Sequence, residues 1–191
     1  MGELILVRHG ETEWARDGRH TGRTDVPLTP YGEEQARALA SLLADRKIVL
    51  AVVSPARRAR RTAELAGLAD GEVDERLWEW DYGAYEGRTT PEIREERPGW
   101  YLWRDGVVDG ETAEQVGART DHVLDEARPH LAEGDVAIVA HGHVLRVLTA
   151  RWLGLPPTDG RLFKLGTGTL SALGTEHDEP VLSTWNVLAR T

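Results

Sequence analysis

The stretch that decides the fold is residues 4–10, Leu-Ile-Leu-Val-Arg-His-Gly. Its four apolar residues are typical of a short buried strand, and the run stops abruptly at an arginine and a histidine. In open α/β sheets, ligands bind at the carboxyl ends of the strands. Arg8 and His9 therefore offer a cation and a nucleophile to one anionic ligand at such an edge.

Two further apolar runs end in polar residues that suit the same ligand. Residues 49–53 precede Ser54-Pro55 and an arginine-rich helix, and residues 136–140 precede His141-Gly142-His143. If the three strands are parallel neighbours, two imidazoles and two guanidiniums face one pocket. Phosphate fits such a pocket, because arginine forks bind its oxygens in pairs and helix N-termini add N–H donors.

The rest of the chain alternates helices with these strands. The predicted segments are a helix from Thr29-Pro30 to residue 43, an arginine-rich helix ending at Gly67, helices over 90–96, 112–132 and 144–153, and late strands over 169–173 and 181–185. This order predicts a three-layer α/β/α sandwich with a mostly parallel central sheet. We expect one domain, residues 1–191, in which the segment from about 78 to 109, here called the lid segment, is a small insertion that covers the sheet edge.

The composition limits the classes of partner. The chain has 23 Lys and Arg against 32 Asp and Glu, a formal charge of −9, which argues against nucleic acid or an anionic membrane as the main partner. It contains no cysteine, so disulfides, thiolate nucleophiles and zinc–thiolate sites are excluded. No N-terminal apolar segment is long enough for a signal peptide or a membrane span, and we therefore expect a cytoplasmic protein.

Each polar feature has an ordinary structural interpretation when it is taken alone. A single histidine at a strand end is more often structural than catalytic, and the arginine-rich run over residues 57–61 is most often a solvated helix face. His141 and His143 lie two residues apart, as metal ligands do, but no carboxylate cluster accompanies them, so we expect no metal. Only the occurrence of these arginine and histidine residues together, at the ends of three predicted strands, favours an active site.

The chain resembles the histidine phosphatase superfamily, the phosphoglycerate mutase-like proteins, along almost its whole length. The matching blocks, in the family's order, are residues 6–12, 21–29 with Gly32 and Gln35-Ala36, 54–63, 77–87, 109–112 and 139–143. The resemblance is strongest to actinobacterial acid phosphatases that are often mislabelled as mutases. It lies in the stretches Gly18-Arg19-His20-Thr21-Gly22 and Glu79-Trp80-Asp81-Tyr82-Gly83.

This resemblance implies a role for five residues. His9 is the nucleophile that becomes a phosphohistidine, with its ring fixed by a backbone carbonyl. Arg8 and Arg58 bind the phosphoryl oxygens, and His141 acts as a cation on the same group. Glu79 is the general acid for the leaving group and then the base for water. From the residues alone, Glu79 is an ordinary loop carboxylate.

Three further residues are expected to contact the phosphate. The resemblance implies contacts from Thr21 and Gly22, and His143 is expected to donate its backbone N–H at the start of a helix. No cofactor is implied. The expected partner is a small phosphomonoester substrate. Whether the protein forms a homodimer, as several relatives do, is left open by the sequence.

A phosphatase is the preferred function, with a cofactor-dependent phosphoglycerate mutase as the alternative. Mutases usually carry an asparagine after the tryptophan of the first block, whereas Trp14 is followed here by Ala15, and mutases are usually longer. A non-catalytic phospho-binding module ranks third, because all five expected residues are present.

Aromatic residues gather in the lid segment. They are Trp78, Trp80, Tyr82, Tyr85, Trp100, Tyr101 and Trp103. They form either an apolar wall against the substrate or a small core of the segment itself, and both interpretations stay open. The segment shows no second cluster of basic residues, which disfavours a bisphosphate substrate.

Overall fold

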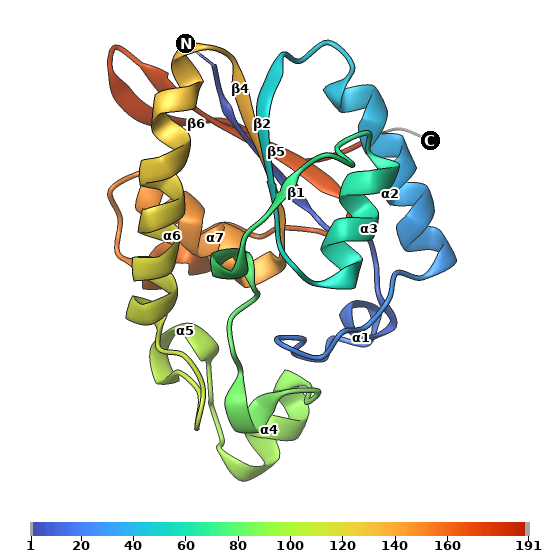
Figure 1. Cartoon of the computed structure of the whole chain (residues 1–191). Helices are drawn as coiled ribbons and strands as arrows, with labels where there is room; N and C mark the ends of the chain where they lie inside the picture. Colours follow the sequence, from blue (N-terminus) through green and yellow to red (C-terminus); the bar gives the residue numbers. More distant parts are fainter. Residues whose placement is uncertain (1, 190–191) are drawn as a thin grey trace.

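A twisted six-stranded sheet lies at the centre of the computed structural model, which describes residues 2–189 (Figure 1). Its strands are β1 (Leu4–Arg8), β2 (Ile48–Val53), β3 (Glu72–Val73), β4 (Asp135–Ala140), β5 (Thr169–Glu176) and β6 (Glu179–Leu188). They lie in the order β3-β2-β4-β1-β5-β6. The first four are parallel, whereas β5 pairs antiparallel with β1 and β6 antiparallel with β5. The mostly parallel sheet is confirmed.

Helices cover both faces of the sheet, so the three-layer prediction is also confirmed (Figure 1). The helices are α2 (Pro30–Leu43) and α3 (Arg57–Leu65) on one face, and α6 (Ala113–Ala127) and α7 (Gly142–Trp152) on the other. Leu4 and Leu6 pack in the core under α6 and α7, while Ile5 and Val7 pack in the core under α2 and α3. A strand buried on both faces carries a continuous apolar run, which is the pattern of residues 4–7.

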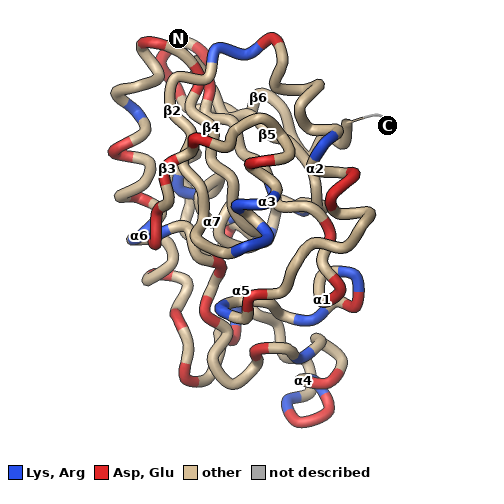
Figure 2. Tube along the Cα trace, turned by 45° about the vertical axis from the view of Figure 1, so that its right-hand side comes forward, with Lys and Arg blue, Asp and Glu red and all other residues tan. Residues whose placement is uncertain are grey.

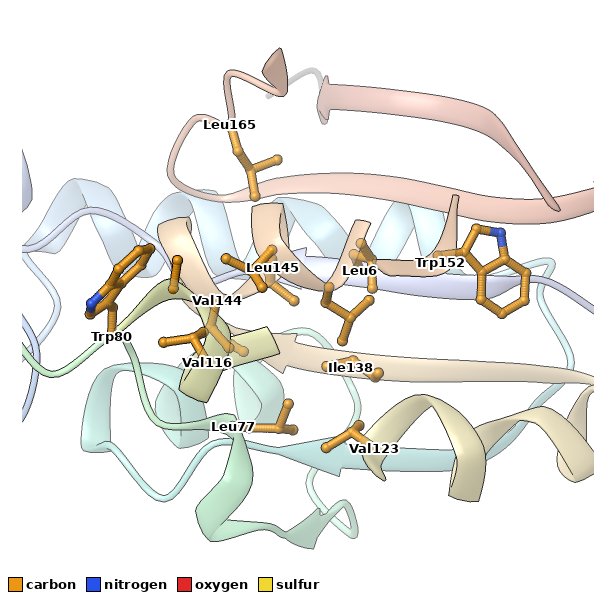
Figure 3. Close-up of a cluster of buried hydrophobic side chains, with 14 of the residues drawn as sticks. Leu6, Leu77, Trp80, Val116, Val123, Ile138, Val144, Leu145, Trp152 and Leu165 are labelled. Carbon is orange, nitrogen blue, oxygen red and sulfur yellow. The ribbon is translucent and has the colours of Figure 1, made fainter. Parts of the chain in front are cut away.

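The core on the α6 and α7 side reaches the carboxyl end of the sheet. Figure 3 shows Val144 and Leu145 of α7 between Val116 of α6 and Leu6 of β1, with Trp80 at the end of the same cluster. Burial of these side chains holds the first turn of α7 against the sheet, since each fully buried aliphatic side chain contributes about 1.5–3 kcal/mol.

Helix ends follow local signals, with two differences from the prediction. Thr29 caps α2 by accepting a hydrogen bond from the Gly32 N–H at 3.0 Å. The helix predicted over residues 112–132 ends as α6 at Ala127 and continues as the 3-10 turn η3 (Arg128–Ala132), because Pro129 has no N–H to continue the α-helical pattern. The last major helix begins at Gly142 rather than at residue 144.

The two late strands form a hairpin that is longer than predicted. His177 and Asp178 connect them with φ of 51° and 66°, the conformation of a tight two-residue turn. Because His-Asp is not the Asn-Gly or Asp-Gly pair that marks such turns, the sequence did not show where the strands meet.

The lid segment contains short elements only. They are the 3-10 turn η2 (Gly83–Tyr85), α4 (Thr90–Glu96) and α5 (Leu102–Asp105), and they lie near α1 (Glu13–Arg16) beyond the carboxyl ends of β1, β2 and β4 (Figure 1). Two other short turns are η1 (Glu75–Leu77) and η4 (Pro157–Leu162). Over residues 2–189, no helix is both long and apolar enough to cross a membrane.

Candidate active site

The three predicted strand ends meet at one edge of the sheet. β4 lies between β2 and β1, and the His9 N–H donates to the Ala140 carbonyl at 3.0 Å while the Ser54 N–H donates to the Val139 carbonyl at 2.9 Å. The ring centroids of His9 and His141 are 5.1 Å apart. The predicted convergence of the two imidazoles is therefore present.

The His9 ring is fixed in one orientation and one tautomer. Its Nδ1 lies 2.7 Å from the Gly10 carbonyl oxygen, so Nδ1 carries the proton and Nε2 keeps its lone pair. The side chain is buried, and burial together with the charges of Arg58 and Arg8 lowers the pKa of His9 well below its ordinary value. The neutral imidazole is the form that a nucleophile requires.

Close packing of the backbone holds the loop that carries His9. A Cβ at Gly10 would lie 2.1 Å from the Gly32 carbonyl oxygen, which is possible only for glycine. The Gly10 N–H donates to the Thr62 hydroxyl at 3.1 Å. Both α2 and α3 therefore brace the turn after β1.

Arg58 is the buried one among the four arginines on α3, where basic residues are gathered in Figure 2. Its Nε donates to His141 Nδ1 at 3.1 Å, and its Nη1 and Nη2 donate to the carbonyls of Thr24 at 2.9 Å and Gly22 at 3.0 Å. These contacts orient the guanidinium beside both histidines. They support the prediction of Arg58, rather than its exposed neighbour Arg57, at this position.

His141 differs from the expected cation. Because Arg58 always donates, His141 Nδ1 is an acceptor, and its Nε2 carries the proton and lies 2.6 Å from the Ser54 hydroxyl. Complete burial and the charge of Arg58 lower the pKa of His141 well below its ordinary value. These contacts favour a neutral ring, and the imidazolium expected beside a bound phosphoryl group stays a prediction.

Arg8 offers an unused donor to the site. Its Nη1 donates to the Leu165 carbonyl, whereas its Nε is buried and has no hydrogen-bond partner among residues 2–189. A Cβ at Gly142 would lie 3.2 Å from Arg8 Cζ, so the glycine lets the guanidinium pack against the start of α7. A buried, unpaired N–H of an arginine suits an anion.

Glu79 lies on the N-terminus of α7. Its Oε1 accepts hydrogen bonds from the backbone N–H groups of Trp80 at 2.9 Å and Val144 at 2.8 Å, and its Oε2 accepts one from the His143 N–H at 2.9 Å. The helix N-terminus and these donors hold the carboxylate in place. Among residues 2–189, Oε2 accepts from this one donor, so it keeps a lone pair for a proton.

Two of the predicted phosphate contacts are wrong as stated. The His143 N–H is already held by Glu79, so it is not the expected phosphate donor, although the residue lines the cleft. The Gly22 N–H donates to both oxygens of Glu86 at 2.9 Å, away from the cleft. Thr21 does line the cleft, with its hydroxyl donating to the Arg19 carbonyl at 3.1 Å.

A cleft of about 360 Å³ opens over these groups, and Arg8, His9 and Glu79 line it. Trp100 and Trp103 line it as well, yet both are largely buried in the core cluster. Trp100 and Trp103 therefore belong to the core and also border the cleft, and a contact with the substrate stays a prediction. A larger cleft, of about 540 Å³ between α3 and β3, contains none of the five predicted catalytic residues.

Sequence reasoning gave no individual role to three side chains in or beside the cleft. Ser54 holds His141, and the Tyr82 hydroxyl lies 2.5 Å from His143 Nδ1. Arg146 lines the cleft from α7. The spacing from Gly142 could have pointed to Arg146, because a residue one helical turn later lies on the same face of the helix.

The described part of the chain holds no group of three or more histidine, aspartate or glutamate side chains placed to bind a metal ion. The cleft and its surroundings present imidazole, guanidinium and carboxyl groups. Together they can bind a phosphoryl dianion, attack it with a neutral nitrogen and move one proton.

Comparison with known proteins agrees with this chemistry. A family model described as the histidine phosphatase superfamily (branch 1) matches residues 4–188. The acid phosphatase of Mycobacterium tuberculosis is 44% identical over 176 residues, which cover 91% of this chain and 87% of that protein. The sedoheptulose 1,7-bisphosphatase of Saccharomyces cerevisiae is 42% identical over 183 residues, covering 79% of this chain and 67% of that protein.

A solved structure shares the whole fold. The product of an open reading frame of Mycobacterium tuberculosis superposes with a TM-score of 0.95 at 41% sequence identity, and the match covers 99% of both chains. At this identity, the similarity extends beyond the fold to the sequence.

Proposed function

The chain belongs to the histidine phosphatase superfamily (branch 1) and is a phosphomonoesterase, and we propose that it hydrolyses small phosphomonoesters through a phosphohistidine on His9. The observation that carries this proposal is the His9 ring. Its Nδ1 is held at 2.7 Å by the Gly10 carbonyl, which leaves a neutral Nε2 beside two arginines.

In the first step, His9 Nε2 attacks phosphorus and the bond between phosphorus and the ester oxygen breaks. Arg8 and Arg58 stabilise the charge on the three equatorial oxygens. Glu79 transfers its proton to the leaving oxygen, so the alcohol departs neutral. A phosphoryl dianion bound here raises the pKa of His141, which then supplies the cation that the sequence predicted.

In the second step, water hydrolyses the phosphohistidine. Glu79, now ionised, takes a proton from the water as its oxygen attacks phosphorus and the bond from phosphorus to His9 Nε2 breaks. Inorganic phosphate leaves, His9 returns to the neutral form, and Glu79 is again protonated for the next cycle.

Two observations support hydrolysis over a mutase reaction. The acid phosphatase and the bisphosphatase named above both remove phosphate, and each is more than 40% identical to this chain. Ala15 lines the cleft where mutases usually carry an asparagine, so the side chain there has no amide for a phosphate.

The test is the release of phosphate from p-nitrophenyl phosphate and glycerol 3-phosphate. We expect the His9→Ala variant to lose more than about 1000-fold in kcat, because no other group replaces the nucleophile. The exposed His130→Ala variant serves as the control and should keep the wild-type rate. Addition of a chelator should leave the rate unchanged.

The contrary outcome is equally clear. Rapid interconversion of 3- and 2-phosphoglycerate in the presence of 2,3-bisphosphoglycerate, with negligible phosphate release, would support the mutase instead. The cytoplasmic location, the homodimer, the single-domain boundaries and the lid role of residues 78–109 stay predictions.

A further inference from the structure

Arg146 is a half-buried cation in the catalytic cleft. Its Nε and Nη2 donate to the carbonyls of Gly160 at 3.0 Å and Arg161 at 3.2 Å, and its guanidinium lies over the Trp103 ring, 4.7 Å from the centroid. No carboxylate of residues 2–189 forms an ion pair with it. Its position is therefore set by carbonyls and an aromatic face, neither of which neutralises the charge.

One other arginine on α6 and one on α7 do have a counter-charge. Arg119 pairs with Glu111 at 2.8 Å, and Arg151 pairs with Asp121 at 2.9 Å. A charged group that leaves water is normally paired, because its desolvation is otherwise uncompensated. Burial accordingly lowers the pKa of Arg146, although an arginine stays protonated. Arg146 thus has the environment of a cation whose counter-charge is supplied by an anionic ligand in the cleft.

The helix places Arg146 at a definite position relative to the phosphoryl site. It lies four residues after Gly142, hence on the same face of α7 and about 6 Å farther along the helix axis. Gly142 packs against the Arg8 guanidinium. Arg8, Arg146 and Trp103 line the same cleft, so a phosphoryl group at Arg8 would leave Arg146 and Trp103 available to the rest of the substrate.

We propose that Arg146 is a specificity-determining residue that selects phosphomonoesters carrying a second anionic group, a carboxylate or a second phosphate, on the part of the molecule that leaves with the ester oxygen. This inference rests on the proposed phosphatase function. The sequence shows no second basic cluster in the lid segment, which disfavoured a bisphosphate substrate. The cation that would bind the second anionic group lies instead on α7, as Arg146. A charge-assisted hydrogen bond of this kind contributes about 1.5–3 kcal/mol, which corresponds to at least tenfold in kcat/KM.

The test compares substrates that differ only in the second anion. The carboxylate arm uses 3-phosphoglycerate against glycerol 3-phosphate, and the phosphate arm uses glucose 1,6-bisphosphate against glucose 6-phosphate. In at least one of these pairs, we expect the wild-type protein to prefer the substrate that carries the second anionic group, by tenfold or more in kcat/KM. The Arg146→Met variant should reduce that ratio below about threefold, mainly through KM, while its rate on p-nitrophenyl phosphate stays within threefold of wild type.

Two further variants separate recognition from structure. Arg146→Lys keeps the charge and should restore part of the preference. Arg128→Met removes a guanidinium that lies 4.4 Å from the centroid of the Trp152 ring, outside the cleft, and should leave every ratio unchanged. The arm in which the ratio collapses identifies the anion as carboxylate or phosphate. Unchanged ratios in Arg146→Met, or an equal loss on all substrates, would overturn the proposal.

A binding measurement keeps this test independent of turnover. In the His9→Ala background, calorimetry should show tighter binding of 3-phosphoglycerate than of glycerol 3-phosphate, or of glucose 1,6-bisphosphate than of glucose 6-phosphate, by at least tenfold. Adding Arg146→Met should remove the difference. If the wild-type protein hydrolyses nothing yet this difference is found, the proposed hydrolysis fails while the anion site stands. If hydrolysis is found without any preference, the anion site fails alone.

Discussion

Glu79, the proposed general acid and base, is held by backbone donors. Three backbone N–H groups hold it, two on Oε1 and one on Oε2. Two of these donors belong to the first turn of α7, whose start also supplies His141 and packs against Arg8. The acid and the phosphoryl-binding groups therefore share one rigid support, and proton transfer requires no rearrangement of the backbone.

Replacement of Glu79 by glutamine should separate the two chemical steps. With p-nitrophenyl phosphate, whose leaving group needs little protonation, the Glu79→Gln variant should release about one equivalent of p-nitrophenolate in a rapid burst. Turnover should then slow by about 100-fold or more, because no base activates the water. With glycerol 3-phosphate, the burst should be absent, since the alkoxide needs the proton. Stopped-flow absorbance and phosphate release measure the two phases.

The control is Glu75→Gln, which changes an exposed carboxylate four residues away whose contact is the Trp78 indole N–H at 2.9 Å. It should show wild-type kinetics on both substrates. A Glu79→Gln protein that hydrolyses glycerol 3-phosphate at the wild-type rate would exclude Glu79 as the general acid.

Among the elements, the contact between the turn after β1 and the start of α2 matters most for the nucleophile. The two backbones approach so closely that a Cβ at Gly32 would lie 2.1 Å from the Glu11 carbonyl oxygen. Thr29 adds a link by donating to the Glu11 carboxylate at 3.0 Å. The orientation of His9 therefore depends on the position of a helix more than twenty residues away in the sequence.

A methyl group at Gly32 should separate these two elements. The Gly32→Ala variant meets backbone atoms that have no side-chain freedom to move aside, and overpacking of this kind lowers the free energy of unfolding by about 1–3 kcal/mol. It should also lower kcat on p-nitrophenyl phosphate, because the His9 ring moves with the turn. Urea denaturation and steady-state kinetics measure both effects.

Glu34→Ala is the matched control, since it changes an exposed position two residues along the same helix. It should change the free energy of unfolding by less than about 0.5 kcal/mol and leave kcat unchanged. A Gly32→Ala protein with wild-type stability and activity would show that the turn is not braced by α2.

At the scale of the whole molecule, folding brings several histidines into a buried, positively charged region. Burial lowers the pKa of His9, His20, His141 and His143 below the ordinary value in every case. In the unfolded chain these groups take up protons below pH about 6.5, whereas in the folded protein they stay neutral. The unfolded state then binds more protons, so stability is present above this pH and is lost as the pH falls.

The free energy of unfolding should therefore decrease steeply between pH 7 and pH 5. Each histidine that is neutral only in the folded state changes the free energy of unfolding by up to about 1.4 kcal/mol per pH unit. Urea denaturation across this range gives the slope. His20→Gln should reduce this slope, because burial lowers the pKa of His20 in the folded protein. A slope near zero would show that these histidines are protonated in the folded protein.

Much of the site was predictable because its parts lie at strand ends. Arg8 and His9, and likewise His141, directly follow apolar runs, and parallel strands bring their carboxyl ends to one edge. Glu79 has no such signal, because it lies in an irregular segment and reaches α7 across 64 residues. Only the family resemblance pointed to it. The role expected for the His143 N–H failed for the same reason, since the sequence could not show that Glu79 occupies that donor.

The sequence by itself determined the alternation of strands and helices, the mostly parallel sheet and the residues at the strand ends, because periodicity, caps and apolar runs are local signals. Tertiary structure alone decided which hydrogen bonds those residues make. It joined Arg58 and Ser54 to the His141 ring and left Arg8 Nε without a hydrogen-bond partner in the part of the chain that the structure describes. It also brought Arg146 into the cleft without an ion pair to any carboxylate of residues 2–189. Protonation states and charge pairing depend on burial and on neighbours distant in sequence, and these exist only once the layers have packed.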